Sequence, residues 1–321
     1  MLPSPALLLL VAGLFAGSPH LVAGPVGQPI RIADHVNSGD RFMGIQLLDS
    51  VALRGDPALA ELSGLAWDQD EQRLLAVSDR GLLLHLQPHF EAGRLVGVDL
   101  LQTYPLLNRR GLPLEGSWRD AEGLTLERAE NGIRGDTHLL ISFERQHRIE
   151  RYRDNGRWLQ TLPLPKPLRN IRLRSNRGLE SLTRHPQLGV VTAPELPPAG
   201  ESHFLASSQG RSWNFVPQEE NGSVVGMETL PNGDLLLLER AYTSIFSPWI
   251  ISLGRIPLPA LLSDQRSIEI EPVARMDSSE GWLTQNMEGL ARHGEQGFFM
   301  VSDDGNRPWA QTQLLYFRLL P

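Results

Sequence analysis

Carboxylate side chains stand at both ends of a hairpin-like segment, residues 286–308, near the C-terminus. Glu288 precedes a Gly-Leu pair, a polar turn follows, and the apolar run 298–301 leads to Asp303. Two short strands around a Gly-containing turn predict a β-hairpin. The acids at its start and end are therefore expected to lie close together, where carboxylates can bind a metal ion or accept a proton.

The same arrangement occurs five times along the chain. The anchoring glycines are Gly64, Gly123, Gly178, Gly226 and Gly289, so successive copies lie 59, 55, 48 and 63 residues apart by subtraction. A self-similar unit near this size in a chain of strands predicts a β-propeller, whose blades run about 40–50 residues each. We therefore expect an all-β propeller with five visible blade repeats, and five or six blades in total.

Equivalent positions of propeller blades converge on one axis, so these acids predict a ring of carboxylates. Clustered carboxylates repel one another unless cations compensate them, and Ca²⁺ accepts about six to eight oxygen ligands at flexible geometry. Ca²⁺ is thus the predicted cofactor. The predicted metal ligands are Glu61, Glu122, Glu180, Glu228 and Glu288 from the hairpin starts, and Asp79, Glu144, Glu195, Glu239, Asp303 and Asp304 from the strand ends.

Arginines provide a second way to compensate these acids. Arg80, Arg145, Arg240 and Arg307 follow or lie near the strand-end acids, and a guanidinium group binds phosphate or carboxylate in a bidentate manner. They are the predicted ligand-binding residues for an anionic or ester substrate. The alternative is structural, because acids at strand ends also cap turns and bond to backbone N–H groups.

Standard catalytic signatures are missing from the sequence. It contains no G-x-S-x-G, H-E-x-x-H or G-x-x-x-x-G-K-[ST] motif, and its nine His residues show no metal-ligand spacing. The absence of Cys excludes disulfides, thiolate metal sites and a cysteine nucleophile. Metal-assisted hydrolysis by carboxylates is therefore the enzyme chemistry that the residues favour. The predicted catalytic residues are Glu122, Glu288 and Asp303.

Composition limits the partner classes. The 321 residues are 41% hydrophobic and 21% charged, with 30 Gly and 24 Pro, as in a folded chain rich in turns. The net charge of -7, and a basic cluster at 169–177 that is short and interrupted, argue against a nucleic-acid partner. Lys166 is the only lysine, so any anion site would depend on arginines and bound cations.

Residues 1–24 predict an export signal, and 25–321 a single propeller domain. The apolar run 6–16 is too short to span a bilayer, which needs about 20 residues, and small residues follow it. The protein is then periplasmic or extracellular; a buried N-terminal segment is the alternative. No later stretch is long and apolar enough to predict a membrane helix.

Other strands must hold the hairpins in place. Residues 41–53 predict one strand ahead of the first repeat, and 313–320 a final strand. These two are expected to pair and close the ring without leaving sheet edges. Residues 121–164 predict a complete four-stranded blade with a turn at Asp154-Asn155-Gly156.

At these residues the sequence resembles the bacterial phytase-like family, also described as "esterase-like activity of phytase". The resemblance runs from about Asp40 to the C-terminus and implies an exported β-propeller with acid-lined Ca²⁺ sites. The matching motifs are Leu62-Ser-Gly-Leu-Ala, Asp120-Ala-Glu-Gly-Leu-Thr, Arg177-Gly-Leu-Glu-Ser-Leu, Asn286-Met-Glu-Gly-Leu and Val301-Ser-Asp-Asp-Gly-Asn.

These observations predict an exported, Ca²⁺-assisted hydrolase of a phosphate or carboxylic ester, with its site at the mouth of the propeller channel. Two alternatives share the fold. One is a non-enzymatic periplasmic propeller that binds a ligand or protein and holds structural Ca²⁺, and the other is a sugar-lactone hydrolase. The fold does not select among them, and the sequence identifies no protein partner.

Overall fold

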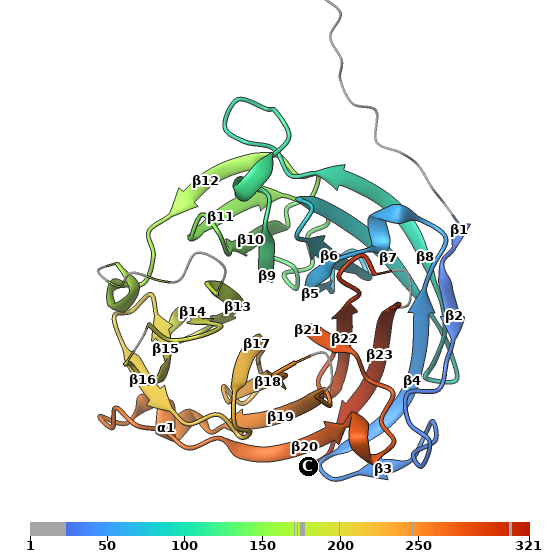
Figure 1. The fold of residues 1–321 in the computed structure, drawn as a ribbon. Coiled ribbons are helices and arrows are strands. Elements are labelled where there is room, and N and C mark those ends of the chain that lie inside the picture. Colours follow the sequence, from blue (N-terminus) through green and yellow to red (C-terminus); the bar gives the residue numbers. More distant parts are fainter. Residues whose placement is uncertain are drawn as a thin grey trace, which may run out of the picture.

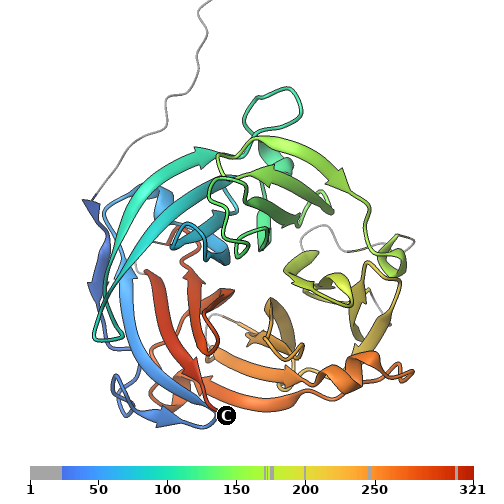
Figure 2. The same cartoon turned by 180° about the vertical axis from the view of Figure 1, so that it is seen from behind.

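The computed structural model describes residues 24–169, 171, 173, 177–198, 200–244, 247–307 and 310–321. Antiparallel sheets stand around a central axis like the blades of a propeller (Figures 1 and 2). Five blades are present, which confirms the predicted fold and settles the blade number at five. The predicted export signal lies outside the described residues, apart from Gly24, which pairs with Leu100.

Each of the first four blades is a run of consecutive strands that follow one another from the axis outward. Blade one consists of β5 (Leu62–Asp68), β6 (Arg73–Ser78), β7 (Leu82–Glu91) and β8 (Arg94–Pro105), with β1 (Gly24–Pro25) outside β8. Blade two consists of β9 (Ala121–Glu127), β10 (His138–Phe143), β11 (Arg148–Arg153) and β12 (Trp158–Leu162). Blade three consists of β13 (Leu179–His185), β14 (Gly189–Pro194), β15 (His203–Ser207) and β16 (Ser212–Phe215). Blade four consists of β17 (Gly222–Thr229), β18 (Leu235–Ala241), β19 (Ile250–Ile256) and β20 (Glu271–Asp277).

Blade five joins the two ends of the chain, as predicted. It consists of β21 (Asn286–His293), β22 (Gly297–Asp303), β23 (Thr312–Leu319), β4 (Ile45–Leu53) and β2 (Gly27–Pro29), with β3 (Arg41–Phe42) also paired to β4. β23 and β4 run antiparallel, with Leu314 opposite Val51. The predicted single strand over 41–53 is wrong in one detail. The chain turns at Met43, whose φ is 49°, so β3 folds back on β4.

Connections between the blades are mostly irregular. They carry η1 (Pro57–Leu59), η2 (Gly116–Trp118), η3 (Lys166–Leu168) and η4 (Ser278–Glu280), whereas α1 (Leu258–Leu262) lies within blade four, between β19 and β20. None of the helices in the described part of the chain has the length and hydrophobicity needed to cross a membrane. The apolar cores lie between neighbouring blades, and Trp213, Trp282 and Phe298 are among their largest fully buried side chains.

A β-bulge occurs at the same place in the innermost strand of every blade. In blade five, Met287 pairs with Ser302 and Gly289 pairs with Val301, so Glu288 has no partner across the sheet. Such a bulge adds one residue to a strand and redirects its side chain. The residues at this bulge position are Ser63, Glu122, Glu180, Val225 and Glu288.

The residue after the bulge lies against the next blade. A Cβ on Gly64 would stand 2.2 Å from the backbone oxygen of Glu122, and one on Gly289 would stand 2.9 Å from the oxygen of Ser63. Blade three departs from the predicted pattern, because Ser181 follows its bulge and Gly178 lies three residues earlier. The innermost strands leave a central void of only about 10 Å³ at this level.

Replacing Gly64 with alanine is expected to destabilise the fold. The new methyl group would collide with backbone rather than with a movable side chain, so the cost should reach or exceed the ~1–3 kcal/mol of typical overpacking. Chemical denaturation of Gly64→Ala measures it. Gly97→Ala is the control, because its Cβ would find its nearest atom, in His89, at 4.0 Å; an equal loss in both variants would contradict the packing argument.

Candidate functional site

Two layers of side chains meet at the end of the channel where the innermost strands begin, which we call the acidic end. The bulge position provides one layer. The other layer is the strand-end position on the second strand of each blade. The residue just before the bulge pairs with a residue of that second strand, and the strand-end position is the next residue along it. It is occupied by Asp79, Glu144, Glu195, Arg240 and Asp303. Backbone bonds mark the equivalence: Asp79 N–H donates to the oxygen of Glu61 and Glu144 N–H donates to that of Asp120, both at 3.1 Å.

The structure therefore brings some of the predicted ring residues together and places others elsewhere. Glu122, Glu180 and Glu288 share the bulge position, whereas Glu61 lies two residues before its bulge and Glu228 three residues beyond. Glu239 faces Val224 across the sheet, one residue before the strand-end position. Blade four thus contributes no acid to either layer.

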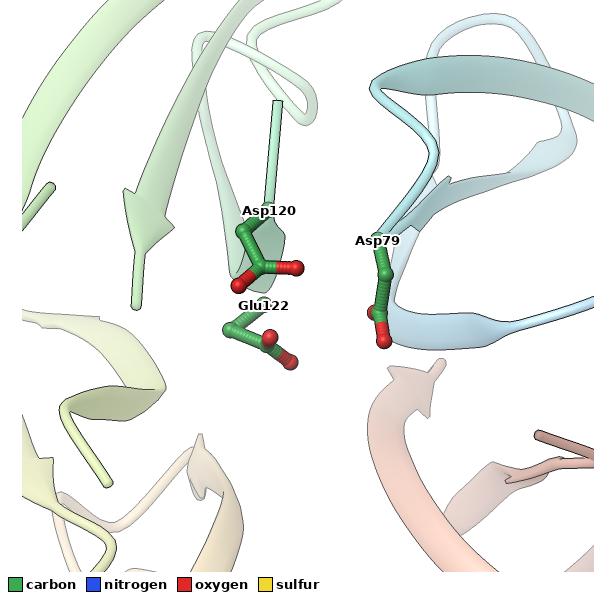
Figure 3. Close-up of side chains that lie close together, drawn as sticks. All are labelled: Asp79, Asp120 and Glu122. Carbon is green, nitrogen blue, oxygen red and sulfur yellow. The ribbon is translucent and has the colours of Figure 1, made fainter. Parts of the chain in front are cut away.

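Carboxylates from blades one to three form two groups compact enough to hold a cation. Asp79, Asp120 and Glu122 make the first group, and Glu122, Glu144 and Glu180 make the second. Within each group, one oxygen from each residue lies within 4.8 Å of the others. Figure 3 shows Asp120 and Glu122 at the start of β9 and Asp79 at the end of β6, with all three carboxylates gathered at one place. Glu122 belongs to both groups.

Burial and mutual repulsion disfavour the charged form of these acids. Burial raises the pKa of Asp79, Glu122 and Glu180 well above the usual range, and the neighbouring carboxylates raise it further. Burial raises the pKa of Glu144 to about 7. Without a bound cation, some of these carboxyl groups therefore stay protonated at neutral pH. A cation must displace those protons, so it should bind more strongly as the pH rises.

Arg240 provides an internal cation on the opposite side of the ring. Its guanidinium donates to Glu195 Oε1 at 2.7 Å, to Asn286 Oδ1 at 2.6 Å, and to Glu288. Its side chain is only 12% exposed. Burial nevertheless raises the pKa of Glu288 to about 8, although Arg240 acts to lower it. With these partners in place, Arg240 is a counter-ion to the ring acids Glu195 and Glu288, and its role in substrate binding stays a prediction.

Other arginines lie at the rim of the acidic end. Arg145 Nε stands 2.7 Å from Asp120 Oδ2, and Arg177 donates to Glu195 at 2.5 Å; both side chains are about half exposed. Arg80 lies 3.9 Å from Glu61. Arg307 is exposed in the loop after β22, where its backbone N–H donates to the oxygen of Asp304 at 3.1 Å. Arg145 and Arg177 therefore combine proximity to the carboxylates with access from solvent.

The remaining predicted acids lie outside the cation groups. Asp303 accepts hydrogen bonds from the Gly305 N–H at 2.6 Å and from Asn286 at 3.0 Å, and burial raises its pKa. Asp304 accepts from the N–H of Glu61 at 3.0 Å, which ties blade five to blade one. Glu239 accepts from the N–H of Gln218 at 2.8 Å. Glu228 lies at the other end of the channel.

Sequence reasoning missed three residues of the acidic end: Asp120, Asn286 and Arg177. Asp120 and Glu122 are two residues apart at the start of one strand, and this spacing places side chains on one face of a regular strand. Asn286 occupies in blade five the place of Asp120 in blade two, so aligning the copies could have found it. Arg177 gives no comparable signal, because its contact with Glu195 depends on how the connection between blades two and three folds.

Comparisons with known proteins give one family match and several distant structural neighbours. The profile of the phytase-like family, described as esterase-like activity of phytase, matches residues 57–306. A search of curated proteins found no match. Among solved structures, a gluconolactonase from Xanthomonas campestris is 12% identical, with a TM-score of 0.40 over 92% of this chain and 100% of that one. An inactive virginiamycin B lyase from Staphylococcus aureus is 11% identical, with a TM-score of 0.41 over 94% and 99%.

Proposed function

The chain belongs to the phytase-like family, and from that premise we propose that it is a Ca²⁺-dependent hydrolase of a small anionic ester, acting at the acidic end of the channel. The observation that carries the proposal is the pair of carboxylate groups that share Glu122. Phosphate and carboxylic esters both suit this chemistry. Export to the periplasm or the outside of the cell, where free Ca²⁺ is abundant, remains part of the proposal.

The donor set fits Ca²⁺ better than a transition metal. Both groups consist of carboxylates alone, without His, and the sequence has no Cys. Hard oxygen ligands suit Ca²⁺, while imidazole and thiolate select Zn²⁺, Cu²⁺ and Fe. The residues that would hold the ions are Asp79, Asp120, Glu122, Glu144 and Glu180. When bound, a divalent cation supplies Lewis-acid polarisation of an ester or phosphoryl oxygen.

The surrounding side chains supply substrate binding and proton transfer. Arg145 and Arg177 are half-exposed guanidinium groups at the rim, placed to hold an anionic substrate group as bidentate donors. Asp303 lies in neither cation group and has a raised pKa, which suits a residue that accepts a proton from water. Glu288, predicted as catalytic, accepts hydrogen bonds from Arg240 and Asn286, and its catalytic role stays a prediction.

Added Ca²⁺ is expected to raise the thermal midpoint relative to EDTA, and more at pH 8 than at pH 5.5. A binding ion stabilises by mass action. Burial raises the folded-state pKa of Glu144 to about 7 and that of Asp79, Glu122 and Glu180 well above the usual range, so without cation the protein loses stability as the pH rises and these groups ionise. Protons therefore compete with the cation less at pH 8 than at pH 5.5. The measurement is thermal unfolding at both pH values, beside turnover of a carboxylic ester and phosphoester panel.

Three outcomes separate the hypotheses. A midpoint rise with Ca²⁺-dependent turnover supports the hydrolase. A rise without turnover of any ester supports the non-enzymatic propeller with a structural ion. If neither Ca²⁺ nor Mg²⁺ moves the midpoint at pH 8, the cation sites do not exist and the acids serve only to organise the strand ends.

A further inference from the structure

A second cavity opens at the far end of the channel, where the innermost strands end. It has a volume of about 600 Å³, within the range of about 300–1,000 Å³ for small-molecule sites. Trp67, Thr125, Thr183, Glu228 and Arg292, from all five innermost strands, are among the residues that line it. The central void between this cavity and the carboxylate groups is only about 10 Å³. One water molecule needs ~10–15 Å³, so a small-molecule ligand cannot pass through the void.

Hydroxyl groups, a carboxyl group and an aromatic ring are among the groups that line the cavity. Thr183 and Thr229 hydroxyls lie 3.1 Å apart, and Glu228 accepts a hydrogen bond from the Arg292 N–H at 3.1 Å. Trp67 is partly exposed, and its edge-on contact with His293, at 4.4 Å between ring centroids, fixes the orientation of the indole. A rigid aromatic surface beside several polar groups recognises a ligand with one apolar face and many hydroxyls.

Charge around the cavity is balanced. Arg128, Arg184 and Arg292 line it together with Glu130, Glu228 and Glu295, and Arg292 lies 3.4 Å from Glu130. The glutamates would repel a strongly anionic ligand, and the arginines would repel a strongly cationic one. Burial also raises the pKa of Glu228 to about 7, which allows its carboxyl to donate as well as accept a hydrogen bond near neutral pH.

We propose that this far-end cavity binds a small neutral saccharide, independently of the cation-dependent chemistry at the acidic end. The sugar's C–H face packs on Trp67, and its hydroxyls bond to Thr183, Thr229 and Glu228. The volume fits one or two sugar rings. Glu228, which was predicted as a member of the metal ring, belongs to this cavity.

Calorimetric titration of the Ca²⁺-saturated protein with D-glucose and maltose tests the proposal. Binding of at least one of the two is expected, with Trp67→Leu and Glu228→Gln each weakening it at least tenfold. Thr183→Val is a milder variant if either of these fails to fold. Glu122→Gln alters the acidic end alone and should retain full saccharide affinity. No heat with either sugar at up to ~50 mM, the weak end of specific binding, would overturn the proposal. Loss of binding in Glu122→Gln alone would overturn it too, because it would place the sugar at the acidic end.

Discussion

Replacing Glu122 with glutamine is expected to abolish cation binding and cation-dependent turnover together. Glu122 is the only residue common to both carboxylate groups, so one substitution removes an anionic ligand from each. Amide oxygen is a weaker ligand than carboxylate. Because loss of an outer partner already costs 10–100-fold in metal affinity, we expect a loss of at least about 100-fold for this ligand.

Although Glu122→Gln weakens cation binding, it should make the cation-free protein more stable. Burial raises the pKa of Glu122 well above its usual range, so the wild-type fold opposes ionisation of this group. Glutamine resembles the protonated acid, and one pKa unit corresponds to about 1.4 kcal/mol. Without cation, Glu122→Gln should therefore be more stable than wild type at pH 8. The difference should disappear at about pH 4, where the unfolded chain also begins to protonate Glu122.

Measurements of stability in EDTA and in Ca²⁺ test two separate parts of this prediction. The variant should gain stability in EDTA and fail to gain more from Ca²⁺. Glu61→Gln is the matched control, since Glu61 lies at the same end of the channel but in neither cation group. If Glu122→Gln retained the full Ca²⁺-dependent midpoint rise, the two carboxylate groups would not be the cation site.

The local sequence pattern was sufficient to predict the fold, because each blade repeats one hairpin. A strand, a turn and a second strand ending in an acid can be recognised from short-range alternation and turn residues. The closing pair of β23 and β4 followed from a general rule, since a ring of sheets must remove its edges. The split at Met43 could not be anticipated, because only the chain's tertiary path requires that residue to take a positive φ.

The residues that belong to the ring were harder to predict, because a shift of one residue in the strand pairing changes which side chains occupy the ring positions. Successive residues of a strand face opposite sides, so the adjacent Glu239 and Arg240 have unrelated surroundings. The sequence offers an acid at both Glu228 and Glu239 in blade four, yet pairing places Val225 and Arg240 at the two ring positions. The bulge adds to the difficulty, since an unpaired residue shifts every later position by one.

Blade four gives the ring its asymmetry. Asp79, Asp120, Glu122, Glu144 and Glu180 form the cation groups on one side, while Arg240 neutralises Glu195 and Glu288 on the other. A guanidinium group fixed by the fold replaces a cation that would otherwise be needed there. Under the proposed function, the ring therefore combines a permanent positive charge with proposed positions for exchangeable cations.

Replacing Arg240 with methionine is expected to destabilise the protein by ~3–5 kcal/mol at pH 8, the usual cost of removing one partner from a buried ion pair. The variant leaves Glu195, Glu288 and Asn286 without their common donor. At pH 5 the penalty should be smaller, because Glu288, whose pKa burial raises to about 8, can take up a proton instead. Urea denaturation at the two pH values measures both effects.

Arg145→Met is the appropriate control for this prediction. Arg145 also pairs with a ring carboxylate, Asp120, but is 52% exposed, so its loss should cost only about 0–1 kcal/mol. Added Ca²⁺ should restore part of the stability of Arg240→Met, because the oxygens of Glu195, Glu288 and Asn286 are hard ligands. The wild-type protein should show no such additional binding. Equal costs for the two variants would mean that Arg240 is not the ring's internal cation, and that its contacts contribute no more than a surface pair.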